Sequence, residues 1–198
     1  MPTPPSPYAA RADEYIAAVG RIEHTDPADR ALLQQWAATV NGPILDVGCG
    51  PGQWTEYLTA AGADIAGIDP VPEFIDRARA DYPHFRFDVG RAEQLPVADR
   101  TLGGILAWYS LIHTPPEQIG AALAEFARCL RPDGRLALGF FTGTRQDRFA
   151  HAVQPAYRWP VDLLVSVLET AGFRVDHTET RSGRPDRDHG AILAARRA

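Results

Sequence analysis

The segment PILDVGCGPGQW (43–54) places one carboxylate, that of Asp46, two residues before the alternating glycines Gly48, Gly50 and Gly52. Glycine has no side chain and tolerates backbone angles that other residues avoid, so a ligand can approach the main chain of such a loop closely. A carboxylate inside an apolar run needs a partner, because an unpaired buried charge is costly. The pattern predicts a binding loop whose ligand carries positive charge.

A second carboxylate, Asp69, ends the apolar segment DIAGID, 21 residues after Gly48. This spacing is typical of a carboxylate that accepts hydrogen bonds from the ribose hydroxyls of a nucleoside. A dinucleotide site would carry G-x-G-x-x-G and bind a pyrophosphate, which a nearby carboxylate opposes. Here the loop is G-x-G-x-G and follows Asp46. We therefore expect a nucleoside with cationic groups, such as S-adenosylmethionine, and keep an NAD-dependent oxidoreductase as the weaker alternative.

Short apolar segments alternate with helical ones along the chain and must position these residues. Expected strands are 44–47, 64–69, 85–89, 103–108, 135–141, 173–181 and 190–198, and expected helices are 8–20, 26–42, 53–62, 72–83, 115–130 and 160–172. Such alternation is typical of an α/β fold with a parallel sheet covered on both faces. No helix separates the last two strands, which predicts that they pair antiparallel.

The quoted motifs resemble those of the class I S-adenosylmethionine-dependent methyltransferases of the small-molecule type (methyltransferase domain 11 or 25). ILDVGCGPGQW resembles the first motif of this family, GIDPVPEFIDRAR its second strand with the ribose carboxylate, and LRPDGRLAL its turn into the fifth strand. The resemblance covers about Ile44 to Ala198. It implies a Rossmann-like, doubly wound, seven-stranded sheet of order 3-2-1-4-5-7-6 with strand 7 antiparallel, in three α/β/α layers. It also implies one structural domain overall, with an N-terminal helical cap (1–42) and a cofactor-binding domain (43–198).

The resemblance implies S-adenosyl-L-methionine as the cofactor and a set of residues that bind it. Asp46 and the glycine loop would line the methionine end, and Asp69 would hold the ribose. The full predicted set is Arg11, Tyr15, Asp46, Gly48, Cys49, Gly50, Gly52, Asp69, Pro70, Ala92, Glu93, Ala107 and Trp108. Arg91 stands where many relatives carry an acid, so adenine recognition is expected to use main-chain atoms near Ala92.

His113, in AWYSLIHTPP after the predicted fourth strand, is the candidate catalytic residue. A neutral imidazole there could take a proton from a hydroxyl or an amine, and a purely structural role is the alternative. The segments 8–18 and 141–160 are expected to form a lid, with His151, Tyr157, Arg158 and Trp159 as a substrate wall or as loop packing. His177 and His189 are expected at the surface.

The composition limits the partners. The chain has 198 residues, a net charge of −5 and no cluster of basic residues, which disfavours nucleic acid as a partner. No apolar run approaches the roughly 18 residues of a membrane span, and the start MPTPPSPY has no signal core, so a cytoplasmic protein is expected. Cys49 and Cys129 have no metal-binding spacing, and no metal is expected.

The function expected from these observations is in-line methyl transfer to a small, partly apolar molecule. Such a reaction needs alignment and exclusion of water more than a large set of catalytic groups. The sequence does not indicate whether oxygen, nitrogen, sulfur or carbon is methylated. A protein that binds S-adenosylmethionine without turnover, as a sensor or scaffold, is the main alternative.

Overall fold

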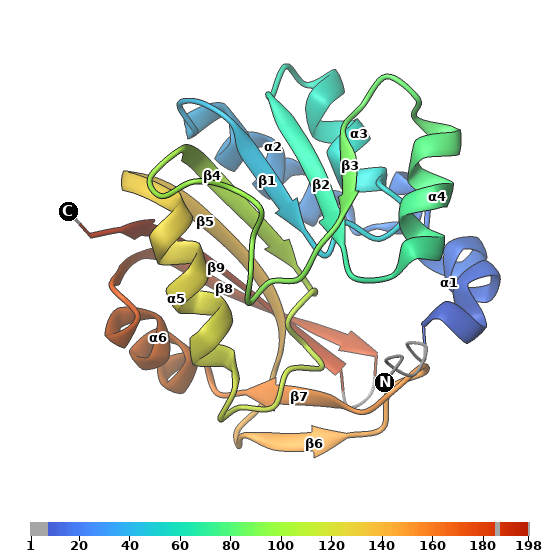
Figure 1. Ribbon diagram of the computed structural model, residues 1–198. Coiled ribbons are helices and arrows are strands. Elements are labelled where there is room, and N and C mark those ends of the chain that lie inside the picture. The colour runs from blue at the N-terminus through green and yellow to red at the C-terminus, as the bar shows by residue number, and fades with distance from the viewer. Residues whose placement is uncertain (1–7, 185–186, 198) are drawn as a thin grey trace, which may run out of the picture.

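One nine-stranded sheet runs through the computed structural model, which describes residues 8–184 and 187–197 (Figure 1). The strands are β1 (Ile44–Val47), β2 (Ile65–Asp69), β3 (Phe87–Val89), β4 (Leu102–Trp108), β5 (Leu130–Thr142), β6 (Asp147–Phe149), β7 (Ala156–Trp159), β8 (Phe173–Arg184) and β9 (Arg187–Arg196). The strands β3, β2, β1, β4 and β5 are neighbours in this order and all parallel. Strand β9 then pairs antiparallel with β5, and β8 pairs antiparallel with β9. With β8 and β9 counted as strands 6 and 7, the predicted order 3-2-1-4-5-7-6 and the antiparallel strand 7 are confirmed.

Strands β6 and β7 form a hairpin that the sequence did not predict. Strand β4 pairs with β5 as far as Gly139 of β5, and β7 pairs with Phe141 and Thr142 of β5. Strand β7 therefore pairs with the part of β5 that extends past the end of β4. The main-chain N–H of Tyr157 also donates to the carbonyl oxygen of Ile112 at 2.8 Å. The hairpin therefore lies beyond the carboxyl end of β4, within the segment expected to form a lid.

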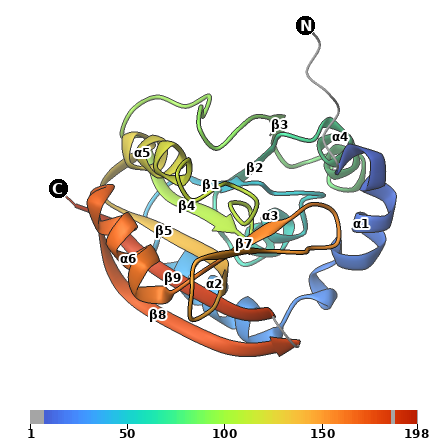
Figure 2. The ribbon, with the colours of Figure 1, turned by 90° about the horizontal axis from the view of Figure 1, so that it is seen from below.

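Helices cover both faces of the sheet. They are α1 (Ala12–Val19), α2 (Pro27–Thr39), α3 (Gln53–Ala60), α4 (Pro72–Asp81), α5 (Ile119–Cys129) and α6 (Val161–Thr170), with short 3₁₀ helices at Ala9–Arg11 and Ile22–His24. In Figure 1, α5 and α6 lie in front of the sheet, and α2 and α3 lie behind it. Figure 2 views the end toward which β1, β2 and β4 point, where α1 and the β6–β7 hairpin lie near each other.

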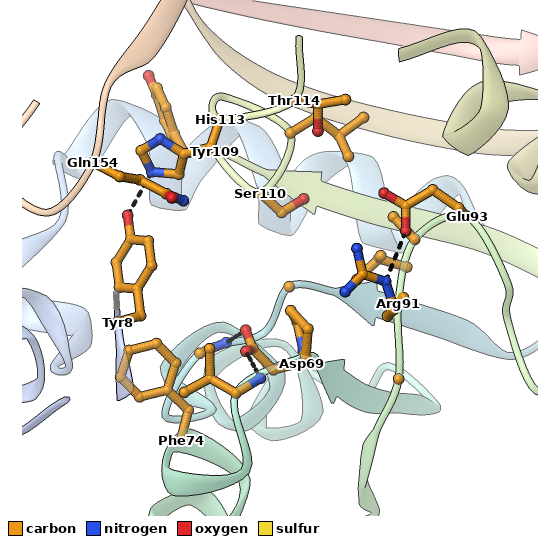
Figure 3. A pocket seen from close by; sticks show the side chains of 18 of the residues that line it. Tyr8, Asp69, Phe74, Arg91, Glu93, Tyr109, Ser110, His113, Thr114 and Gln154 are labelled. Atoms are coloured by element: carbon orange, nitrogen blue, oxygen red, sulfur yellow. Dashed lines mark hydrogen bonds and ion pairs between the residues drawn. The ribbon is translucent and has the colours of Figure 1, made fainter. Parts of the chain in front are cut away.

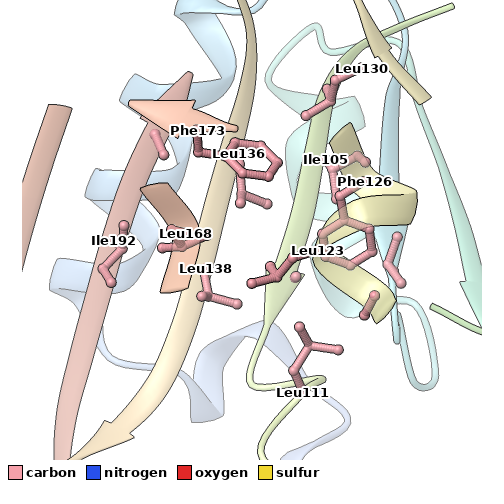
Figure 4. Packing of buried hydrophobic residues seen from close by; sticks show 14 of the residues in the cluster. Ile105, Leu111, Leu123, Phe126, Leu130, Leu136, Leu138, Leu168, Phe173 and Ile192 are labelled. Atoms are coloured by element: carbon pink, nitrogen blue, oxygen red, sulfur yellow. The ribbon is translucent and has the colours of Figure 1, made fainter. Parts of the chain in front are cut away.

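The larger core lies between the sheet and helices α5 and α6 (Figure 4). Ile119, Leu123 and Phe126 recur at helical spacing along α5, and each is buried against the sheet. Burying side chains of this size stabilises the fold by roughly 1.5–3 kcal/mol each. This packing fixes β4 and β5, whose ends carry part of the site.

A second core on the opposite face includes part of the segment predicted as an N-terminal cap. Leu33 and Trp36 of α2 pack with Ile44 of β1 and with Trp54 and Leu58 of α3. Asp26 caps α2 by accepting a hydrogen bond from the Ala28 N–H at 2.8 Å. Helix α2 thus packs on the sheet, and the earlier part of this segment reaches the carboxyl ends of the strands.

Candidate functional site

Two adjoining cavities, of about 300 and 680 Å³, lie at the carboxyl ends of β1, β2 and β4. The first includes the ends of β1 and β2 and the segment after β3, and the second extends toward β5, β9 and α1. The residues that line both are Tyr8, Tyr15, Gly48, Gly50 and Tyr109. The glycine loop therefore separates two parts of one continuous site.

The glycine loop needs glycine for two different reasons. Gly48, Gly50 and Gly52 have φ angles of +77°, +55° and +91°, which other residues rarely adopt. A Cβ on Gly48 would lie 2.3 Å from Cβ of Ser110, whereas a Cβ on Gly50 would meet no atom within 4 Å. The N–H groups of Gly48 and Cys49 donate to the carbonyl oxygen of Ile68 at 2.8 and 3.0 Å. The loop is thus fixed to β2 and leaves bare main chain at Gly50 open to a ligand.

Asp69 ends β2 and lines the first cavity (Figure 3). Its carboxylate accepts hydrogen bonds from the N–H of Gly50 at 2.9 Å and from the N–H of Val71 at 2.8 Å. Only 6% of the residue is exposed, and this burial raises its pKa to about 6 in spite of the two hydrogen bonds. These bonds hold the carboxylate at the mouth of the glycine loop, where it can also accept from ligand hydroxyls.

Asp46 lies on β1, and only 2% of it is exposed. Its carboxylate accepts a hydrogen bond from Oγ1 of Thr55 in α3 at 2.8 Å. The pKa of Asp46 is raised to about 7, mainly by burial and to a smaller extent by the charge of Asp69, although the hydrogen bond from Thr55 lowers it. Two such carboxylates beside bare main chain form a site suited to a ligand with cationic and hydroxyl groups.

His113 lines the first cavity and contacts Tyr8, the first residue that the structure describes (Figure 3). Its Nδ1 lies 2.9 Å from the carbonyl oxygen of Pro155, which can only accept, so Nδ1 carries the proton. Nε2 then accepts a hydrogen bond from the hydroxyl of Tyr8 at 2.6 Å. Burial lowers the pKa of His113, in keeping with a neutral ring.

A family model described as "Methyltransferase domain" matches residues 44–134. An uncharacterized methyltransferase of Mycobacterium bovis is 33% identical over 133 residues, which are 67% of this chain and 53% of that protein. The residues matched by the family model contain Asp46, the glycine loop and Asp69. The chain belongs to the class I S-adenosylmethionine-dependent methyltransferases. It spans about half the length of the curated relatives it matches.

Solved structures share the fold of this chain. One is the Burkholderia thailandensis 1,6-didemethyltoxoflavin-N1-methyltransferase with bound 1,6-didemethyltoxoflavin and S-adenosylhomocysteine, with a TM-score of 0.73, 23% identity, and coverage of 100% of this chain and 92% of that one. The [4+2]-cyclase SpnF has a TM-score of 0.81, 18% identity, and coverage of 100% and 99%. Because a cyclase also has this fold, the fold alone does not define the reaction.

The other predicted site residues fall into three groups. Pro70, Ala92 and Glu93 line the first cavity, and Arg11, Cys49 and Trp108 line the second. Gly52 and Ala107 line neither: Gly52 caps α3 against the ring of Phe87, and Ala107 is fully buried in the core. Arg91, beside Ala92, forms an ion pair with Glu93 at 3.4 Å (Figure 3).

Tyr109 and His189 line the second cavity, and the predicted set of site residues contains neither of them. Tyr109 follows β4 with a φ of +57°, and its hydroxyl lies 2.7 Å from Nδ1 of His189 on β9. The expectation that His189 lies at the surface holds only in part: β9 pairs with β5 and sets His189 opposite Phe141, and its half-buried side chain lines the second cavity. The other histidine expected there, His177, is exposed.

His151 also lines the second cavity, in the segment between β6 and β7. Burial and the neighbouring His113 and Arg187 lower its pKa to about 4, so its ring is neutral at physiological pH. Its Nδ1 is buried and has no hydrogen-bond partner among the residues that the structure describes. The other residues of the predicted wall, Tyr157, Arg158 and Trp159, line neither cavity.

Within residues 8–184 and 187–197, no group of three or more His, Cys, Asp or Glu side chains is arranged to hold a metal ion. Over the same residues, no helix has the length and apolar character needed to cross a membrane.

Proposed function

We propose that this protein transfers the methyl group of S-adenosylmethionine to a small, partly apolar molecule. The observation that carries the proposal is the placement of Asp46 and Asp69 toward the carboxyl ends of the neighbouring strands β1 and β2, in the lining of two cavities that both include bare main chain at Gly50. Both carboxylates are buried with raised pKa values, which a ligand bearing cationic and hydroxyl groups would relieve.

The residues around the first cavity fit the nucleoside part of the cofactor. Asp69 would accept from the ribose hydroxyls, and main-chain atoms near Ala92 would contact the adenine. Oγ of Ser110, which lines this cavity, is buried with no hydrogen-bond partner among the described residues, and a polar ligand atom would satisfy it. Asp46, in the second cavity, would attract the ammonium group of the methionine part. When bound, S-adenosylmethionine supplies a methyl group activated by its sulfonium.

The second cavity supports a small, partly apolar acceptor. Trp54, Trp108 and Phe141 contribute aromatic surface, and His151 and His189 contribute polar groups. The net charge of −5 disfavours a nucleic-acid substrate. A protein of the same fold is named as the N1-methyltransferase of 1,6-didemethyltoxoflavin, a small molecule.

Two measurements test the proposal. Isothermal titration calorimetry should detect binding of S-adenosylmethionine and S-adenosylhomocysteine to the purified chain. A screen of small hydroxyl, amine and thiol compounds should then find one that releases S-adenosylhomocysteine. Absence of binding by folded protein would overturn the proposal. Binding without turnover by any compound would instead support a sensor or scaffold.

A further inference from the structure

Aromatic and imidazole rings form a continuous group on one side of the second cavity. Phe141, at the end of β5, lies at the centre, with its ring centroid 5.3 Å from that of Tyr109, 5.8 Å from His151 and 5.5 Å from His189. All four residues line the second cavity, and we call them the ring wall. Because aromatic rings prefer offset or edge contacts with other rings, the ring wall favours a flat, unsaturated ligand.

The polar atoms of the ring wall differ in whether they already have partners. The hydroxyl of Tyr109 and Nδ1 of His189 satisfy each other at 2.7 Å. The imidazole of His151 has its Nδ1 buried with no hydrogen-bond partner among the described residues. A buried polar group without a partner is costly, so a ligand that donates a hydrogen bond to His151 would be favoured. His151 is therefore the residue of the ring wall that can recognise a hydroxyl or amine, by accepting its hydrogen bond.

Two of the three arginines that line the second cavity already pair with carboxylates, whereas the third, Arg187, forms no ion pair among the residues that the structure describes. Arg181 forms ion pairs with Asp26 at 3.0 Å and with Asp29, which is buried. Arg11 pairs with Glu14 at 2.7 Å. A carboxylate or phosphate on the acceptor would have to compete with these existing pairs.

We propose that the methyl acceptor is a planar aromatic molecule with a hydroxyl or amine, and that His151 accepts the hydrogen bond and then the proton of this group. The inference rests on the proposed function and extends it to a substrate class and a catalytic residue. The acceptor atom bonds to the methyl carbon, the electron pair of the broken carbon–sulfur bond stays on sulfur, and the acceptor proton moves to His151.

His151 suits this role although burial weakens it as a base. Its ring is uncharged at physiological pH, so it is ready to accept a proton. As the acceptor atom bonds to carbon, its own proton becomes strongly acidic, and even a weak base can then remove it. His113 is less available, because both of its ring nitrogens already have partners in Tyr8 and Pro155.

The test compares three probes on the complex of the full chain with S-adenosylhomocysteine. The probes are 2-naphthol, its saturated analogue decahydro-2-naphthol, and 2-methoxynaphthalene, which lacks the donor. Calorimetry should show that 2-naphthol binds about three- to tenfold more tightly than either of the others. Equal affinity for all three would overturn the inference while leaving the proposed function intact, whereas a failure of S-adenosylhomocysteine to bind would remove both.

A His151→Phe variant separates the two parts of the inference. It keeps a ring in the wall and removes the nitrogen atoms, so the preference for 2-naphthol over decahydro-2-naphthol should remain and the preference over 2-methoxynaphthalene should disappear. With S-adenosylmethionine, kcat for methylation of 2-naphthol should fall by about 100-fold. The matched control is His84→Phe, at an exposed position outside both cavities, which should change neither measurement. No turnover of 2-naphthol, or an unchanged kcat in a normally folded His151→Phe, would overturn the catalytic role.

Discussion

The hydroxyl of Tyr8 lies 2.6 Å from Nε2 of His113, a residue that follows it by 105 positions. The ring of Tyr8 also packs on Tyr15 and Phe74, with centroids 5.2 and 5.9 Å apart. Tyr8 and Tyr15 line both cavities, so this contact ties the start of the described chain to the strand ends. We infer that His113 positions the segment that covers the site, while its role as a base stays a prediction.

Tyr8→Phe and His113→Ala test this positioning role. Each removes the hydrogen bond between Tyr8 and His113, and His113→Ala also removes the one to Pro155. Tyr8→Phe should therefore weaken S-adenosylhomocysteine binding by about 0.5–1.5 kcal/mol and His113→Ala by at least as much, and the double variant should lose no more than His113→Ala alone. Calorimetry on the wild type, the two single variants and the double variant completes the double-mutant cycle. Additive losses would contradict a shared contact. If kcat falls much further in His113→Ala than in Tyr8→Phe, His113 acts as the base.

Gly50→Ala should separate ligand contact from backbone strain. Its φ of +55° makes the alanine variant less stable by roughly 1–2 kcal/mol, although no atom lies within 4 Å of the new Cβ. The methyl group would occupy the space where main chain and ligand meet, so S-adenosylmethionine binding should be lost. Gly62→Ala is the matched control, because Gly62 has a φ of +97°, has equally open surroundings and lines neither cavity. Thermal melts and calorimetry should show destabilisation of both variants and loss of binding in Gly50→Ala alone. Full binding by Gly50→Ala would place the cofactor elsewhere.

The alternation of apolar strands with helices predicted a parallel sheet, and the lack of a helix between the last two strands predicted their antiparallel pairing, whereas the strand order was implied by the resemblance to the family. The positions of Asp46 and Asp69 followed from the same pattern, since adjacent parallel strands end at the same edge of a sheet. These features depend on local periodicity and on chain order, which one sequence contains.

The β6–β7 hairpin and the site role of His189 could not be predicted in this way. The segments DRF and AYRW have no alternating pattern, and β7 becomes a strand because β5 extends past the end of β4. His189 reaches the second cavity through the register of β9 against β5, and a shift of one residue would turn it to the other face. Both the hairpin and the position of His189 depend on strand pairing and register. These are tertiary properties, which the local pattern of one sequence does not contain.

Asp69→Ala should weaken S-adenosylmethionine binding by roughly 1–3 kcal/mol, because a charge-assisted pair of hydrogen bonds to the ribose would be lost. The variant also removes the acceptor for the N–H groups of Gly50 and Val71, so Asp69→Asn should retain part of the affinity through its carbonyl oxygen. Asp88→Ala on β3 is the control, since this exposed carboxylate pairs with Arg79 and lines neither cavity. Calorimetry gives the three affinities. Equal losses for Asp69→Ala and Asp88→Ala would argue against a direct contact.

The affinity for S-adenosylmethionine should rise with pH between 5 and 7.5. The pKa of Asp46 is raised to about 7 and that of Asp69 to about 6, so both carboxylates are partly protonated in this window without ligand. A cationic ligand favours the ionised forms, so its binding releases protons, and affinity should fall about tenfold per pH unit below the pKa of an essential carboxylate. Asp46→Asn should bind more weakly and show a flatter profile near pH 7.

The same two pKa values predict the opposite trend for the stability of the ligand-free protein. A raised folded-state pKa means that the native state binds more protons than the unfolded state between about pH 4 and 7, so stability falls as pH rises through this window. Asp46→Asn removes its share of that loss, so its ligand-free form should be more stable than the wild type at pH 8 and show a smaller decline from pH 5. Urea unfolding at pH 5 and pH 8 measures the free energy of unfolding of both proteins. If this free energy increases from pH 5 to pH 8 by the same amount in the wild type and in Asp46→Asn, Asp46 is ionised throughout this range.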